Sequence, residues 1–201
     1  MQEHPVEAIL DAARDQFVAA GVRRSSADDI ARRAGVNRAT IYRRVGTKEE
    51  IVRATYVHEA QRVLAAIEQA IGPVPDPGPA SADFDAAEYV AAFFTVTITA
   101  LRENKLLRQL LDVDPDETLA GLTLRAGDVI ALASTLAADR MRRLRAYVGN
   151  THVDDIDDLA GTFARIAQSL LLTPDAPPRL TTEASMRDYA RRVIAPMVLG
   201  R

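Results

Sequence analysis

The sequence contains no cysteine among its 201 residues, which excludes disulfide bonds and zinc sites built on thiolates. This composition fits a reducing compartment such as the cytoplasm. The three histidines, His4, His58 and His152, are too far apart to pair as metal ligands on one helix. No uninterrupted apolar run reaches about 18 residues, so we expect no membrane-spanning helix. The first ten residues lack the basic and long apolar segments of a signal peptide, so none is expected.

Strand patterns and common enzyme motifs are also scarce. Alternation of Val, Ile and Thr occurs only in residues 93–100, and the helical patterns on both sides favour a helix there. The chain has no nucleophile elbow, P-loop or glycine-rich dinucleotide turn. Hydrophobic residues make up 48% of the chain, which is enough for a packed core. We therefore predict an all-α fold of about nine helices, without enzymatic activity or a cofactor.

Glycine and proline indicate where the expected helices end. A first amphipathic stripe ends at Gly21, and proline-rich breaks occur at residues 72–81 and 173–179. Two capping boxes, Ser26 with Asp29 and Thr47 with Glu50, each indicate a helix start. Further helices are expected at about residues 27–34, 37–44, 47–71, 85–102, 104–113, from 115, 125–148, 153–172 and 182–195.

Positive charge is concentrated near the N-terminus. Residues 21–53 hold nine basic and four acidic side chains, although the whole chain has a formal net charge of −3. A local positive field on an otherwise acidic chain indicates a polyanionic partner at that end. Solvated arginines on an ordinary helix face would give the same charge count.

The basic segment has the pattern of a helix-turn-helix. Gly35 would allow the turn after the first short helix, and Asn37 would cap the second. Ile30 and Ile41 would point inward, and small Ala31 would let the two helices approach closely. In such a motif the second helix lies in the major groove of DNA.

The outward residues of the second helix suit DNA. Arginine can donate to guanine, the methyl groups of Thr and Ala can contact thymine, and tyrosine and arginine bind phosphate. Lys48, in the first turn of the next helix, can reach the flanking backbone. The candidates on the second helix are Arg38, Ala39, Thr40, Tyr42, Arg43 and Arg44.

The segment SSADDIARRAGVNRATIYRRVGTKEEIV, residues 25–52, resembles the DNA-binding domain of TetR-family transcriptional regulators, and the resemblance covers about residues 5–55. It departs from that pattern at Arg44, where the family often has histidine, and at Val45, where it often has phenylalanine. The resemblance implies contacts to phosphate near Ser26 and Ala27, to bases at Asn37, Arg38, Ala39 and Thr40, and to the backbone at Tyr42, Arg44 and Lys48.

The resemblance also implies two domains: a helix-turn-helix DNA-binding domain at residues 1–50 and a helical effector-binding and dimerisation domain at residues 51–201. Apolar stripes on the last two long helices independently favour a homodimer interface, although they could instead pack in the core of one subunit. The interface candidates are Ile156, Leu159, Phe163, Ile166, Leu170, Tyr189, Val193 and Met197.

The segment at residues 87–103 is apolar on nearly all sides, which is typical of a buried helix. Its aromatic and hydroxyl side chains could line a pocket for a small-molecule effector. The pocket candidates are Tyr89, Phe93, Phe94 and Thr97, and an ordinary core role remains the alternative for each.

The functional prediction is a cytoplasmic, nucleoid-associated homodimer that binds an inverted repeat in operator DNA. We expect it to act as a repressor that a small-molecule effector releases from the operator. One alternative is a helical small-molecule or partner-binding protein whose helix-turn-helix does not bind DNA. Another is a metal-dependent enzyme using Asp112, Asp114 and Asp116, although this acidic stretch also has the pattern of a helix N-terminus with Pro115 in the first turn. Residues 153–158 have a similar acidic pattern.

Overall fold

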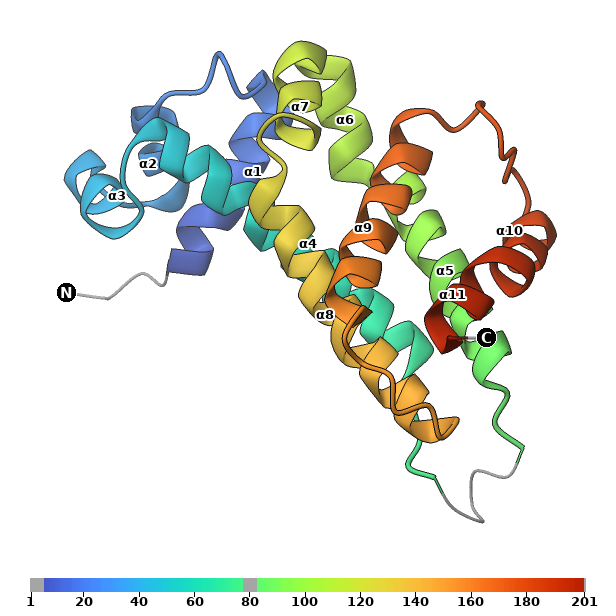
Figure 1. Cartoon of the computed structure of the whole chain (residues 1–201). Coiled ribbons are helices and arrows are strands. Elements are labelled where there is room, and N and C mark those ends of the chain that lie inside the picture. The colour runs from blue at the N-terminus through green and yellow to red at the C-terminus, as the bar shows by residue number, and fades with distance from the viewer. Residues whose placement is uncertain (1–5, 78–82, 201) are drawn as a thin grey trace. The chain divides into compact units, whose positions relative to one another are not determined.

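The computed structural model describes residues 6–77 and 83–200 (Figure 1). All regular elements within these two ranges are helices, and the ranges contain no strand, which confirms the expected all-α fold. The predicted loop at residues 72–81 is irregular at residues 72–77, and its last part lies outside the described residues. The helix predicted for residues 93–100 is also confirmed.

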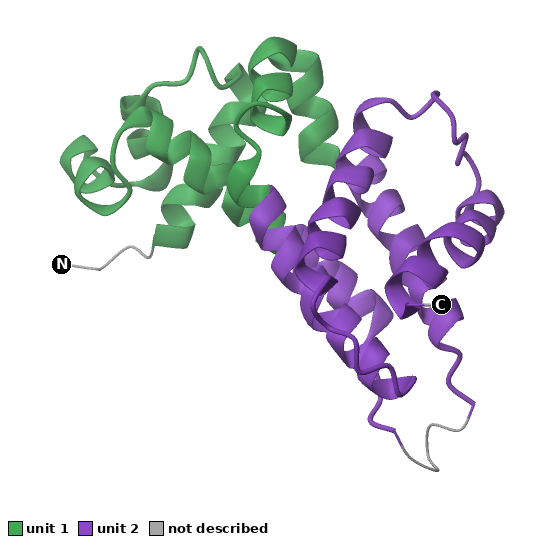
Figure 2. Ribbon diagram, in the orientation of Figure 1, with its two compact units in different colours: residues 1–62, 104–129 green, residues 63–103, 130–201 purple. Residues whose placement is uncertain are grey.

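The chain forms two compact units (Figure 2). Unit 1 comprises residues 1–62 and 104–129, and unit 2 comprises residues 63–103 and 130–201. Unit 1 is larger than the helix-turn-helix domain predicted for residues 1–50, because Tyr56, Leu106 and Leu110 pack against the same core. The assignment of separate functions to two domains stays a prediction.

Unit 1 surrounds one apolar core to which each of its first four helices contributes a fully buried side chain. Ile9 and Phe17 of α1, Ile30 of α2, Ile41 of α3 and Ile51 of α4 are at most 1% exposed. The helices of this unit are α1 (Val6–Ala20), α2 (Ala27–Ala34), α3 (Arg38–Arg44), the first part of α4 (Lys48–Ile71), α6 (Lys105–Val113) and α7 (Pro115–Leu122).

Unit 2 is built around α5, whose residues Ala91, Phe94 and Ile98 are completely buried. Phe94 lies 6.1 Å from Phe163 and 5.8 Å from Tyr189 between ring centroids, so aromatic contacts link α5 to two other helices. The helices of this unit are the end of α4, α5 (Ala86–Glu103), most of α8 (Gly127–Tyr147), α9 (Ile156–Leu172), α10 (Glu183–Tyr189), η2 (Ala190–Ile194) and α11 (Ala195–Leu199).

The C-terminal helix extends further than the predicted end at residue 195. A π-helical turn, η2, precedes Pro196, and the N–H of Ala195 donates to the carbonyl of Ala190, five residues back. Proline lacks an N–H and its ring crowds the preceding turn of a regular α-helix. The wider π turn accommodates the proline ring, and the helix continues to Leu199.

Two acidic N-cap positions differ from the local pattern expected in the sequence. Asp114 precedes α7 and Asp155 precedes α9, but neither side chain makes a capping hydrogen bond. Instead, Asp114 accepts from Arg23 and Asp155 accepts from Arg145. A guanidinium carries a full positive charge, whereas a helix N-terminus presents only a partial one, so each carboxylate pairs with the arginine instead of capping the helix.

Arg145 is the most deeply buried charged residue among the described residues, with 1% of its surface exposed. Its Nε donates to the carbonyl of Val198 at 2.8 Å, and its Nη1 donates to the carbonyl of His152 at 2.7 Å. The Asp155 carboxylate balances its charge, and the contact lowers the pKa of Asp155. Arg145 therefore joins α8 to the end of α11 and to the loop before α9.

No single helix in residues 6–77 and 83–200 combines the length and apolar composition needed to cross a membrane. One bent pair, α7 with α8, reaches both criteria when its two helices are taken together.

Candidate functional site

The turn between α2 and α3 has the geometry of a helix-turn-helix. Gly35 has φ of 66°, a left-handed conformation that favours glycine, and it ends α2. The N–H of Val36 then donates to the carbonyl of Ala31 at 3.0 Å. Asn37 caps α3 by accepting from the N–H of Thr40 at 2.8 Å, as the sequence predicted. These bonds fix the direction in which α3 leaves the turn.

The start of α2 is held by a complete capping box. The Ser26 hydroxyl oxygen accepts from the N–H of Asp29 at 3.2 Å, and the Asp29 carboxylate accepts from the N–H of Ser26 at 3.0 Å. Hydrogen bonds from Ser26, reinforced by Arg32, lower the pKa of Asp29 to about 2. The equivalent box at α4, with Thr47 and Glu50, is also formed.

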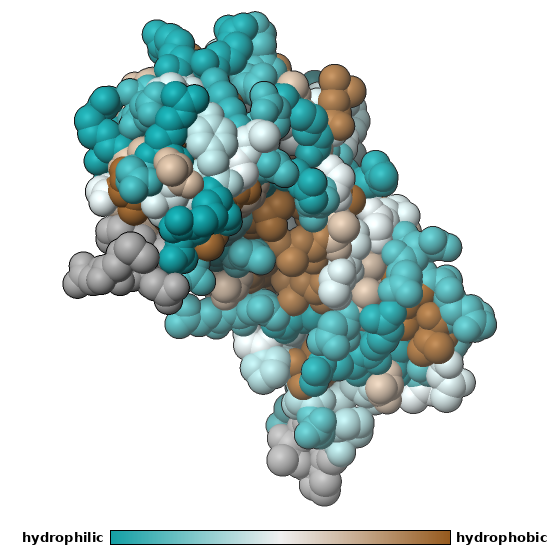
Figure 3. All heavy atoms as spheres, turned by 90° about the vertical axis from the view of Figure 1, so that its left-hand side faces the viewer, coloured by the Kyte–Doolittle hydropathy of each residue, from teal (hydrophilic) through white to brown (hydrophobic). Residues whose placement is uncertain are grey.

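The outer face of α3 is available to a ligand, whereas its inner face is not. Ile41 is completely buried, while Arg38, Ala39, Tyr42 and Arg43 are exposed. The remaining candidates on this helix, Thr40 and Arg44, are half-buried. Hydrophilic residues cover most of the surface on the side where α3 lies (Figure 3).

Arg38 is oriented by two neighbours on the exposed face. Its Nη1 donates to the Asp28 carboxylate of α2 at 3.1 Å, and its Nη2 donates to the Tyr42 hydroxyl at 3.1 Å. The guanidinium carbon also lies 5.2 Å from the centre of the Tyr42 ring. The contacts with Tyr42 and Asp28 raise the pKa of Arg38, which keeps its positive charge. Sequence reasoning did not single out Asp28, because only the fold places it beside α3.

Ser26 and Ala27 have different surroundings at the start of α2. Ser26 is exposed, but the side chain of Ala27 is 6% exposed and belongs to the unit 1 core. A phosphate contact at Ala27 would therefore have to use its backbone N–H rather than its methyl group.

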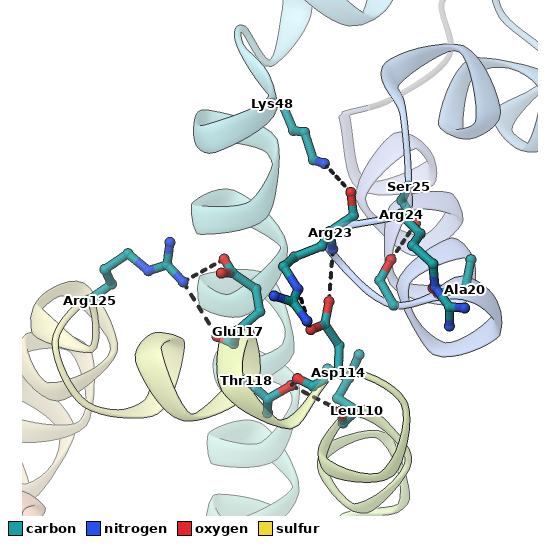
Figure 4. A network of polar contacts seen from close by, with 11 residues as sticks. Ala20, Arg23, Arg24, Ser25, Lys48, Leu110, Asp114, Glu117, Thr118 and Arg125 are labelled. Atoms are coloured by element: carbon teal, nitrogen blue, oxygen red, sulfur yellow. Dashed lines mark hydrogen bonds and ion pairs between the residues drawn. The ribbon is translucent and has the colours of Figure 1, made fainter.

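Lys48 lies at the start of α4 and contacts the turn before α2. Its Nζ donates to the carbonyl of Arg23 at 3.0 Å. The backbone N–H of Arg23 donates to Asp114 Oδ2 at 2.8 Å, and its Nε donates to Asp114 Oδ1 at 3.0 Å. Figure 4 shows that these three residues form one continuous chain of polar contacts. The position of Lys48 is therefore linked to the junction between α6 and α7.

Gly21 allows the close approach between that turn and Asp114. Its φ of 84° is unfavourable for other residues, and an added Cβ would lie 3.2 Å from both Cβ and Oδ2 of Asp114. A larger residue would push the two segments apart.

The four predicted pocket residues have two kinds of surroundings in unit 2. Tyr89 and Phe93 line a small cavity, together with Arg140 and Met141. Phe94 is completely buried in the core, and the Thr97 hydroxyl donates to the carbonyl of Phe93 at 2.7 Å. The role of these residues in effector binding stays a prediction, and Arg140 is an additional lining residue that sequence reasoning missed.

The predicted interface residues also divide into two groups. Ile156, Phe163 and Leu170 are at most 8% exposed and belong to the core of unit 2. Leu159, Ile166 and Tyr189 are half-buried against that core, whereas Val193 is 37% and Met197 is 41% exposed. An interface on this stripe would therefore use the second group, and its existence stays a prediction.

The acidic stretch proposed as a metal site has a different arrangement. Both Asp114 oxygens accept hydrogen bonds from Arg23, which already balances the carboxylate. Among the residues that the structure describes, no three His, Cys, Asp or Glu side chains are grouped so as to hold a metal.

These observations define an all-helical fold, over the described residues, in which the second helix of an N-terminal helix-turn-helix has an exposed outer face. Residues 9–55 match the sequence model of the bacterial regulatory proteins of the tetR family. The chain thus carries a TetR-family N-terminal domain, which confirms the resemblance seen in its sequence.

Solved TetR-family structures have the same fold along the whole chain. The TetR family repressor AlkX from Dietzia sp., described as implicated in biodegradation of n-alkanes, is 20% identical, with a TM-score of 0.68 and coverage of 100% of this chain and 98% of that one. The repressor QsdR from R. erythropolis is 20% identical, with a TM-score of 0.64 and coverage of 96% and 93%. A TetR-family regulator from Streptomyces coelicolor is 18% identical, with a TM-score of 0.57 and coverage of 98% and 99%. No curated protein sequence matches this one significantly.

Proposed function

We propose that this protein is a sequence-specific DNA-binding transcriptional regulator. The observation that carries this proposal is the exposed face of α3, which combines Arg38, Tyr42 and Arg43 on a helix fixed at both ends by the turn geometry. An exposed helix of this kind fits the major groove, where arginine can donate two hydrogen bonds to guanine. Ser26, the backbone at Ala27, Arg44 and Lys48 would contact the flanking phosphates.

Arg38 would exchange its partners on binding. In the free protein its guanidinium is paired with the exposed Asp28 carboxylate, a contact of modest strength in water. Guanine could replace Asp28 as the partner of Arg38, while the contact with Tyr42 would keep the Arg38 side chain extended away from the helix. The acidic remainder of the chain would limit binding of other surfaces to DNA.

The active form in this proposal is a homodimer, because two readers must lie about 34–36 Å apart, or a multiple of that spacing, to contact an inverted repeat. The exposed side chains of Val193 in η2 and Met197 in α11 support an interface on these elements and on α9, where Leu159 and Ile166 are half-buried. The protein would act in the bacterial cytoplasm at the nucleoid.

Repression with release by a small-molecule effector is the proposed mode of regulation. AlkX and QsdR, which share the fold, are both described as repressors. Effector binding in unit 2 would favour a reader spacing that fits the operator poorly. Such coupling between sites typically amounts to about 1–3 kcal/mol.

The first experiment is selection of bound duplexes from a random library with the purified full chain at about 150 mM salt, where non-specific phosphate binding is weakened. We expect the sequenced duplexes to share an inverted repeat. Recovery of random sequences, with binding only at low salt, would contradict a sequence-specific regulator and favour a helical binding protein without a functional reader.

Two variants then separate base contacts from phosphate contacts. Arg38→Ala is expected to weaken operator binding by about 1–3 kcal/mol while changing random-duplex binding much less. Lys48→Ala should weaken binding to operator and random duplexes alike, and it should reduce the dependence of affinity on salt. Equal losses on operator and random DNA for Arg38→Ala would exclude base reading by that residue.

A further inference from the structure

A cavity in unit 2 has one charged residue in an otherwise apolar wall. Tyr89 and Phe93 of α5, Met141 of α8 and Phe163 of α9 supply aromatic and thioether surface, and Arg140 of α8 supplies a guanidinium. The cavity volume is about 20 Å³, which is roughly the space of one water molecule. An organic ligand therefore needs its walls to move apart.

Arg140 is buried but only partly neutralised. Its Nη1 donates to the carbonyl of Gly72 and to the Tyr89 hydroxyl, which are both uncharged. Its acidic partner is Glu68, at 3.4 Å from Nη2, and that carboxylate side chain is 47% exposed while the arginine side chain is 11% exposed. Nε makes no hydrogen bond to any described residue. A buried cation whose acidic partner is half exposed to water would gain from a second anion inside the cavity.

Aromatic rings help to hold the guanidinium at the cavity. Its central carbon lies 5.8 Å from the centre of the Phe93 ring and 6.0 Å from that of Tyr89. The rings and the Gly72 carbonyl together keep the position of Arg140 fixed without cancelling its charge. This leaves an oriented donor beside apolar surface.

A second cavity of about 10 Å³ shares Met141, Phe163 and Val198 with the first. Leu159 and Met197 line its other side. Methionine side chains change rotamer easily, so movement of Met141 would join the two spaces into one longer apolar pocket with Arg140 at one end. Its shape would suit a narrow hydrocarbon body.

We infer that the small molecule bound by unit 2 is an apolar organic acid whose carboxylate pairs with Arg140 and whose hydrocarbon body lies along Met141 and Phe163. This inference deepens the proposed function, since only in a DNA-binding regulator would this acid be the effector. Two parallel charge-assisted hydrogen bonds from Nη2 and Nε to the carboxylate would orient the ligand.

The test compares matched ligands by calorimetry on the purified full chain in the absence of DNA. The probes are hexanoate, octanoate and decanoate, each paired with the alcohol and the amine of the same length. At least one carboxylate is expected to bind about tenfold or more tightly than its alcohol, in line with the net strength of a charge-assisted hydrogen bond, and the amines should bind least. Equal affinities of acids and alcohols, or no binding of any acid, would overturn the inference.

Substitutions then test whether Arg140 supplies the preference. Arg140→Met should remove the difference between octanoate and octanol, and Arg140→Lys should keep part of it. The matched control is Arg143→Met on the same helix, because Arg143 is 61% exposed and pairs with Asp139. If circular dichroism shows that Arg140→Met does not fold, the preference for acids over alcohols is compared between the unchanged protein and Arg140→Lys. An undiminished preference in Arg140→Lys would then contradict the assignment. A folded Arg140→Met variant that still prefers the acid would contradict the assignment.

Adding a selected operator duplex separates this inference from the regulator function. Acid binding in calorimetry together with no specific duplex would support the ligand site and reject the DNA-binding proposal. Specific duplex binding without acid binding would reject the ligand site alone.

Discussion

Several arginines of unit 1 are exposed to solvent, whereas two arginines of α8 are buried in unit 2. The side chains of Arg23, Arg32 and Arg38 in unit 1 are 65%, 76% and 58% exposed. In unit 2 the side chains of Arg140 and Arg145 are 11% and 1% exposed. The same residue type therefore meets two different physical environments in one chain.

This difference determines what each guanidinium can do. An exposed arginine contributes little to stability through its ion pairs, but it can exchange a carboxylate for a phosphate or a base at small cost. A buried arginine needs fixed acceptors for its donors, and it stabilises the segments that supply them. Removing charge should therefore impair binding in unit 1 and folding in unit 2.

The largest expected loss of stability comes from a substitution that removes the hydrogen-bond network of Arg145. Arg145→Met would leave the carbonyls of His152 and Val198 without their donor and Asp155 without its partner. We expect the free energy of unfolding to fall by about 3 kcal/mol, since several buried acceptors lose their bonds together. Urea unfolding followed by circular dichroism measures this loss.

Arg143→Met is the matched control for Arg145→Met. It removes the same charge from the same helix, but its pair with Asp139 is exposed. We expect its free energy of unfolding to stay close to that of the unchanged protein. Similar losses for the two variants would contradict the claim that burial separates their roles.

An intermediate effect is expected at Asp114, the buried carboxylate that holds an exposed arginine of unit 1. Asp114→Asn removes the charge and one of the two acceptors for Arg23, which should reduce stability by about 1–2 kcal/mol. The turn that supplies the Arg23 carbonyl to Lys48 would lose its anchor, so affinity for all duplexes should change together. Unfolding and duplex binding are measured on the same variant.

Asp116→Asn distinguishes this network from a general charge effect. Asp116 is exposed in the same acidic stretch, and its charge acts mainly on the start of α7. We expect this control to lower the free energy of unfolding by no more than about 0.5 kcal/mol. An equal loss at Asp116 would mean that local charge, rather than the contact with Arg23, accounts for the result.

Local signals in the sequence predicted the caps and the turn of the helix-turn-helix accurately. Ser26, Gly35 and Asn37 each act within a few residues of themselves, so capping and turn rules were sufficient for their roles. The same rules were incomplete at Asp114 and Asp155, because each carboxylate accepts from an arginine that is distant in the sequence or lies across a loop. Short-range patterns contain no information about such competitors.

The burial of two arginines on α8 is harder to predict from the sequence. Ala137, Met141 and Leu144 mark the buried face of this helix, and Arg140 and Arg145 each lie four residues from one of them. That spacing would place both arginines at the edge of the apolar face. It does not show that backbone carbonyls at Gly72 and Val198 are available to accept from them, which depends on the folded core.

The smallest expected effect concerns acid stability at the start of α2. Hydrogen bonds from Ser26 lower the pKa of Asp29 to about 2, below its usual 3.8. The unfolded chain therefore binds this proton first as the pH falls, and the stabilisation is present above about pH 4 and disappears between about pH 4 and pH 2. Asp29→Asn should be less stable than the unchanged protein near neutral pH, and the gap should narrow across that acidic range. Urea midpoints of both proteins at several pH values test this, and a gap that stays constant to about pH 2 would rule out a contribution from Asp29 ionisation.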